Sequence, residues 1–146
     1  MKNIQEGLGI WQILNSNIIT DIIAKSGFDL TLFDLEHGIH TPQSIQDCVF
    51  AAKSNGLFTI ARIPCISFQK IVQLIDTGID AILFPHIETN EQINQVVKET
   101  LLPPLGCKSF SPFVTKYDYG IKDKDLKENP YIGILIESLN GINNSN

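Results

Sequence analysis

Residues 27–38 read GFDLTLFDLEHG, and this stretch contains the pattern that decides the fold. Gly27 is expected to end a preceding helix, because glycine readily adopts the backbone conformation found just beyond a helix C-terminus. The run Asp29–Phe33 is short and mainly apolar, which is typical of a buried strand. Titratable residues follow it directly, from Asp34 to His37. The stretch therefore predicts a buried strand whose carboxyl end carries chemically active groups.

The same pattern recurs along the chain. Further apolar runs predict strands at residues 8–14, 57–61, 80–84 and 131–136. Amphipathic segments separate them and predict helices at residues 17–26, 41–55 and 67–77 and from residue 89 onward. Thr41, Ser67 and Thr89 are the expected N-caps, and Gln92 completes a capping box with Thr89. Apolar strands that alternate with helices predict an α/β protein with a buried parallel sheet.

Residues 103–130 interrupt this alternation. Prolines and glycines recur through the segment, so it is expected to form a long loop before the last strand. A loop of this length in a compact domain is usually functional or mobile.

The composition excludes several classes of protein. The chain has 146 residues and a net charge of −5, which suits one acidic domain and argues against nucleic acid or an anionic membrane as a partner. The three cysteines are scattered, as expected for reduced thiols, and none has an evident catalytic partner. The N-terminus lacks the apolar stretch of a signal peptide, so we expect a cytoplasmic protein.

Titratable groups follow most of the predicted strands. Asp34, Glu36 and His37 follow one strand, Arg62 follows the next, His86 comes after the fourth, and Glu137 follows the last. The carboxyl ends of parallel strands form the active-site edge both in β/α barrels and in open doubly wound sheets. Either arrangement brings these side chains together, which predicts a functional site at this edge.

Each candidate also has a simpler interpretation. Asp34 and Glu36 could cap the following turn, and Arg62 could be a structural ion-pair partner. Asp76 lies near the end of a helix, where an acid is unfavourable, and this weakly suggests another use. His40 and His86 are interpreted as surface or packing residues.

Six motifs occur along the chain: GIWQIL (9–14), FDLEHG (33–38), ARIP (61–64), LIDTGIDAILFPHIET (74–89), LPPLGCKS (102–109) and ILIES (134–138). In these motifs the chain resembles the HpcH/HpaI aldolase/citrate lyase family, and FDLEHG resembles its D-x-E-H-G motif. The order and spacing of the motifs agree with the family from about residue 9 to residue 144. The resemblance implies a single incomplete domain over residues 1–146, a partial (β/α)8 TIM barrel of the phosphoenolpyruvate/pyruvate type with about five of eight strands.

The resemblance also implies an activity. It is retro-aldol cleavage of a 4-hydroxy-2-oxo acid to pyruvate and an aldehyde, with magnesium, manganese or cobalt as a Lewis acid. Glu137 would be a metal ligand, Arg62 would stabilise the enolate and His37 would be the general acid/base. Asp76 would be the dyad partner of His37, and Asp34 would support that histidine. A homo-oligomer, often a hexamer, is expected of the family.

Three departures from the family pattern bear on activity. Leu135 stands where many members carry glutamine, and Lys108 replaces an arginine. The sequence ends before a sixth strand that would supply a second metal carboxylate, so the first and fifth strands are expected to be sheet edges. We therefore expect little or no aldolase activity from this chain alone.

Other functions remain open. The related citrate-lyase-type branch cleaves acyl-CoA thioesters, although an early D-x-E-H-G motif favours the aldolases. An inactive fragment or a non-catalytic α/β module that assembles through its sheet edge is the alternative of a different class.

Overall fold

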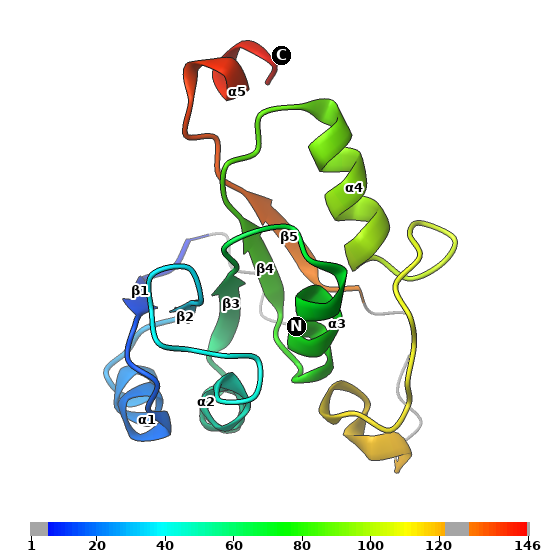
Figure 1. Cartoon of the computed structure of the whole chain (residues 1–146). Coiled ribbons are helices and arrows are strands. Elements are labelled where there is room, and N and C mark those ends of the chain that lie inside the picture. Colours follow the sequence, from blue (N-terminus) through cyan, green and yellow to red (C-terminus); the bar gives the residue numbers. More distant parts are fainter. Residues whose placement is uncertain (1–5, 122–128, 146) are drawn as a thin grey trace.

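A computed structural model describes residues 6–121 and 129–145 of the chain. Its centre is one sheet of five parallel strands in the order β1-β2-β3-β4-β5 (Figure 1). The strands are β1 (Gly9–Gln12), β2 (Leu30–Asp34), β3 (Phe58–Arg62), β4 (Ala81–Phe84) and β5 (Tyr131–Ile134). The predicted α/β class with about five parallel strands is confirmed, and β1 and β5 are the edges of the described sheet.

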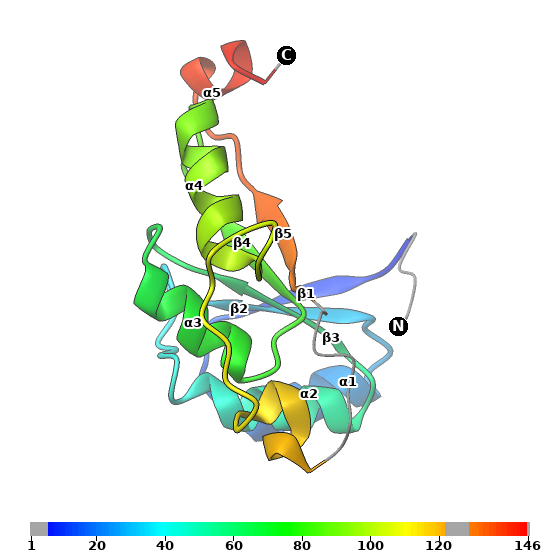
Figure 2. The same cartoon turned by 90° about the vertical axis from the view of Figure 1, so that its right-hand side faces the viewer.

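Helices connect the strands and lie on one side of the sheet. Figures 1 and 2 show α1 to α4 packed against the same face. The helices are α1 (Asn17–Lys25), α2 (Ile45–Ser54), α3 (Phe68–Asp76), α4 (Asn90–Thr100), α5 (Leu139–Asn143) and the 3-10 helix η1 (Thr115–Gly120). Gly27, Gly56 and Gly78 follow α1, α2 and α3 with φ values of 88°, 71° and 92°, a region that favours glycine. The predicted helix end at Gly27 is therefore confirmed, and α2 and α3 end in the same way.

The main core lies between the sheet and these helices. Phe33, Ala61 and Ile82 are aligned on neighbouring strands and are fully buried there. The opposite face of the sheet carries an aligned apolar row whose two ends, Trp11 and Tyr131, are 50% and 51% exposed. Among the described residues, one face of the sheet is thus covered by helices and the other is partly open.

α2 starts later than the sequence indicated. Its N-cap is Ser44, three residues beyond the expected Thr41. The backbone N–H of Thr41 donates to Ser44 Oγ (2.8 Å), and that of Ser44 donates to Thr41 Oγ1 (3.1 Å). These reciprocal bonds satisfy the backbone in a turn, so the chain turns before the helix begins.

The segment before β5 contains the short helix η1, and residues 122–128 of the predicted loop lie outside the described residues. Gln46 Nε2 donates to Thr115 Oγ1 at 2.8 Å and ties η1 to α2. Within residues 6–121 and 129–145, no helix has the length and apolarity needed to cross a bilayer.

The cap of α4 gives a direct test of local stability. Thr89 and Gln92 form the predicted capping box, with the Gln92 N–H donating to Thr89 Oγ1 at 3.3 Å. Thr89→Ala is expected to lower the free energy of unfolding by about 1 kcal/mol, measured by urea denaturation. Ser67 caps α3 without a side-chain hydrogen bond, so Ser67→Ala is the matched control. Equal losses in both variants would contradict the capping account.

Candidate active site

The carboxyl ends of β2 and β3 are joined by an ion pair. Asp34 and Arg62 are aligned on the two strands. Arg62 Nε donates to Asp34 Oδ1 at 3.0 Å and Nη2 donates to Oδ2 at 2.6 Å, a bidentate geometry. Burial raises the pKa of Asp34, but hydrogen bonds from Arg62 and from the backbone of His37 and Glu36 outweigh it and bring the pKa below its usual value. Asp34 is therefore a charged structural anchor.

Asp34 also shapes the turn that follows β2. Its Oδ1 accepts hydrogen bonds from the backbone N–H groups of Glu36 (3.0 Å) and His37 (3.2 Å). This is the local side-chain bond that aspartate commonly forms in turns. The turn presents Glu36 and His37 above the strand ends.

The Arg62 side chain contacts three residues. Besides Asp34, its Nη1 lies 3.1 Å from Glu36 Oε2, and its Cζ lies 4.5 Å from the centre of the Trp11 ring. The arginine side chain is 13% exposed. The hydrogen bond with Asp34 is the main cause that raises the pKa of Arg62 above its usual value, so the positive charge is permanent.

A histidine joins Glu36 to the end of β5. His86 Nε2 lies 3.1 Å from Glu36 Oε1, and His86 Nδ1 lies 3.2 Å from Glu137 Oε2. The backbone N–H of His86 also donates to Glu137 Oε2 at 3.1 Å. His37 is more distant and more exposed, with its Nε2 at 3.8 Å from Glu36 Oε1.

We name these residues the strand-end cluster: Asp34, Glu36, His37, Arg62, His86 and Glu137. The structure brings together His37, Arg62 and Glu137 as expected, with Glu36 and His86 between them. His86 was interpreted as a surface or packing residue; its side chain is 64% exposed, and both of its ring nitrogens face carboxylates of the cluster. Its position after β4, at the same sheet edge, is the sequence signal for a role in this site.

Asp76 lies elsewhere. It ends α3, the helix that returns the chain from the carboxyl end of β3 to the amino end of β4. Its Oδ1 lies 3.3 Å from the Nζ of Lys108, a side chain that is 1% exposed. The predicted pairing with His37 therefore does not form within one chain. The lysine that replaces the family's arginine makes one contact with the Asp76 carboxylate, where arginine could make two, and it also donates to the carbonyl oxygen of Ser109 at 2.9 Å.

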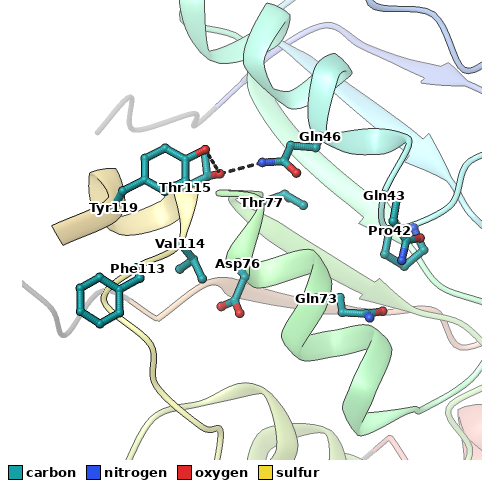
Figure 3. A pocket seen from close by; sticks show the side chains of 10 residues that line it. All are labelled: Pro42, Gln43, Gln46, Gln73, Asp76, Thr77, Phe113, Val114, Thr115 and Tyr119. Carbon is teal, nitrogen blue, oxygen red and sulfur yellow. Dashed lines mark hydrogen bonds between the residues drawn. The ribbon is translucent and has the colours of Figure 1, made fainter. Parts of the chain in front are cut away.

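Asp76 lines a separate pocket of about 320 Å³ on the helix side of the sheet (Figure 3). The pocket lies between α2, α3 and the segment that contains η1. Its lining residues are Pro42, Gln43, Gln46, Gln73, Asp76, Thr77, Phe113, Val114, Thr115 and Tyr119. No member of the strand-end cluster contributes to it.

The cluster offers one carboxylate ligand for a cation, but it does not supply a full set of ligands. Oε1 of Glu137 makes no hydrogen bond within the described residues, and this side chain is 41% exposed. Within those residues, no three His, Cys, Asp or Glu side chains are grouped to hold a metal ion. Magnesium-type ions commonly bind one or two carboxylates and take water or substrate oxygens as their other ligands. Glu137 fits that mode of binding.

His40 is a packing residue, as expected. It is 6% exposed, its Nε2 lies 3.0 Å from the carbonyl oxygen of Gln12, and its ring packs edge-on against Phe33 at 5.5 Å. Burial lowers the pKa of His40 below its ordinary value of 6.5.

This shift predicts a pH effect on stability. As the pH falls below about 6.5, the unfolded chain takes up a proton that the folded chain resists, so acid destabilises the fold. His40→Gln is expected to lose less stability between pH 7 and pH 5 than the wild type does. Urea denaturation at both pH values measures this, and an equal loss in both proteins would refute the assignment.

Comparisons with known proteins agree with this architecture. The profile of the HpcH/HpaI aldolase/citrate lyase family matches residues 8–146. The chain belongs to this family. A hydroxypyruvate/pyruvate aldolase of Roseobacter denitrificans is 34% identical over 108 residues, which cover 72% of this chain and 42% of the relative. A 5-keto-4-deoxy-D-glucarate aldolase of Escherichia coli is 30% identical over 143 residues, which cover 96% of this chain and 56% of the relative.

The fold is also similar to that of a solved structure of the family. An HpcH/HpaI aldolase/citrate lyase family protein from Burkholderia cenocepacia superposes with a TM-score of 0.88 at 23% identity, over 95% of this chain and 58% of that one. The chain thus spans about half the length of the HpcH/HpaI relatives that it matches.

Proposed function

We propose that the strand-end cluster binds a pyruvate-type 2-oxo acid and serves the reversible cleavage of a 4-hydroxy-2-oxo acid into pyruvate and an aldehyde. The observation that carries this proposal is the fixed guanidinium of Arg62, which lies at the same sheet edge as His37 and Glu137. The two relatives described above are both named as aldolases, which favours this reaction over the acyl-CoA lyase alternative.

Arg62 provides positive charge where negative charge develops. The guanidinium has five N–H groups. Hydrogen bonds to Asp34 use one N–H each from Nε and Nη2, and Nη1 forms an ion pair with Glu36 Oε2 at 3.1 Å. The remaining N–H groups can donate to the oxygen of an enolate, and donors fixed in advance stabilise such charge strongly.

The proposed reaction balances without a redox step. His37 takes the proton of the C4 hydroxyl, and the electrons of that O–H bond form the carbonyl of the aldehyde. The C3–C4 bond breaks, and its electron pair forms the enolate of pyruvate beside Arg62. The proton then returns to C3 through His37 or a water molecule. His37 has a side chain that is 70% exposed, so it can reach a substrate above the strand ends.

Glu137 is the residue that would hold a divalent cation, which we propose to be magnesium, manganese or cobalt. When bound, such an ion polarises the keto oxygen as a Lewis acid. One protein carboxylate should hold it weakly, so we propose that this chain alone turns over slowly. An inactive α/β module is the second candidate, because the described residues do not form a complete cation site.

We still propose that Asp76 is the dyad partner of His37, although the two side chains do not pair within one chain. Its carboxylate would act on His37 only if it came from a second copy, as in the homo-oligomer that we expect. Sedimentation of the purified chain tests whether such an assembly exists.

Exchange of the methyl protons of pyruvate for deuterium tests the proposal without the unknown aldehyde. Enolate formation and return of a proton at C3 are sufficient for exchange, which ¹H NMR detects in D₂O. We expect exchange that needs Mn²⁺ or Mg²⁺ and falls by about 100-fold or more in His37→Asn. Binding of the cation and pyruvate without exchange above the buffer rate would favour the non-catalytic module.

A further inference from the structure

His86 adopts a backbone conformation that is unusual for its residue type. Its φ is 57°, in the left-handed region where residues other than glycine are uncommon. Such a conformation costs free energy and persists only where neighbouring contacts impose it. These positions concentrate at functional sites, so the contacts that hold His86 are informative.

The chain on both sides of His86 is anchored to β5 and the core. The N–H of Leu135 donates to the carbonyl of Phe84 at 2.8 Å, and the N–H of Ile87 donates to the carbonyl of Leu135 at 3.2 Å. Phe84 and Ile87 are buried, with exposures of 0% and 3%. The His86 ring is 64% exposed. The flanking residues therefore carry the packing, and the ring itself fills no core space.

Three contacts of His86 reach acidic side chains of the cluster. Its backbone N–H and its Nδ1 both meet Oε2 of Glu137, while its Nε2 meets Oε1 of Glu36. The left-handed backbone directs the N–H and the ring towards the same carboxylate. With Oε2 engaged in this way, Glu137 keeps Oε1 free of described partners.

The negative charges of Glu36 and Glu137 explain why a residue is needed between them. Glu36 and Glu137 would repel each other at the same sheet edge, and Arg62 lies on the Glu36 side, with its Nη1 at 3.1 Å from Glu36 Oε2. His86 is the group that separates the two glutamates and contacts both. Without the ring, Glu137 would be free to turn into solvent or towards Arg62.

We propose that His86 is a positioning residue that orients Glu137 for a divalent cation. This inference rests on the proposed function, because it takes Glu137 as the cation anchor. Residues that contact a metal ligand and fix its orientation are important for binding. Their removal commonly weakens metal affinity by about 10- to 100-fold.

Titration of the purified chain with Mn²⁺ tests the proposal, with free Mn²⁺ measured by its electron paramagnetic resonance signal. His86→Gly keeps the left-handed backbone and the N–H but removes the ring, and we expect the Kd for Mn²⁺ to rise about 10-fold or more. His86→Asn tolerates the same backbone and restores one donor, so its Kd should lie between those of wild type and His86→Gly. Circular dichroism shows whether each variant is folded.

The outcomes separate the two proposals. Glu137→Gln should abolish binding if Glu137 is the anchor. Loss in Glu137→Gln with an unchanged or lower Kd in His86→Gly would overturn the positioning role and leave the proposed function standing. No Mn²⁺ binding by the wild-type chain would overturn both the anchor and the positioning residue.

Discussion

Arg62→Met is expected to lower the free energy of unfolding by about 3 kcal/mol, because removing one partner of a buried ion pair leaves the other charge without compensation. Asp34 is only 2% exposed, and Arg62 supplies two of its hydrogen bonds. Urea denaturation at pH 7 measures the loss. The double variant Arg62→Met/Asp34→Asn should recover part of it, because the remaining buried group is then uncharged.

A surface ion pair provides the matched control. Lys25 and Asp21 form an i,i+4 pair whose side chains are 66% and 40% exposed. Exposed pairs add little to stability, so Lys25→Met should leave the urea midpoint almost unchanged. If Arg62→Met were as mild as Lys25→Met, the bidentate pair would not be the anchor of the strand-end cluster.

Phe84→Ala should destabilise the chain by about 3–5 kcal/mol, the usual range for removing a buried aromatic ring. Phe84 ends β4 and is fully buried in the main core. The loss combines the transfer free energy of the ring with the cavity it leaves. The same change would disturb His86, two residues later, so thermal unfolding should be measured before any test of binding.

Phe113 is the matched control for this substitution. It is 76% exposed, so Phe113→Ala should change the free energy of unfolding by no more than about 0.5 kcal/mol. A small loss in Phe84→Ala would mean that the face of the sheet covered by helices is not the main core.

Local signals were sufficient to predict most of the fold. Apolar runs predicted all five strands within a few residues, and Gly27 predicted the end of α1. The start of α2 was wrong because Thr41 and Ser44 bond each other in a turn, a competition that periodicity does not reveal.

The candidate site was less accessible to sequence reasoning. Asp34, Glu36, His37, Arg62 and Glu137 were placed together by one rule, that parallel strands end at the same edge. Glu36 and His86 received no catalytic role, because Glu36 could cap the turn after its strand and His86 was interpreted as a surface or packing residue. Their contacts depend on the backbone of residue 86 and on side-chain directions, which the residue pattern does not specify.

The most direct test of the account is to map where pyruvate and Mg²⁺ bind, using ¹H–¹⁵N chemical shifts of the backbone amides. The account predicts shifts that saturate at Glu36, His37, His86 and Glu137, and that are lost in Glu137→Gln. Amides beside the separate pocket, such as those of Gln73 and Thr115, should not move. Shifts confined to that pocket, or no saturable shift at the strand ends, would contradict the central claim that this sheet edge receives a keto acid.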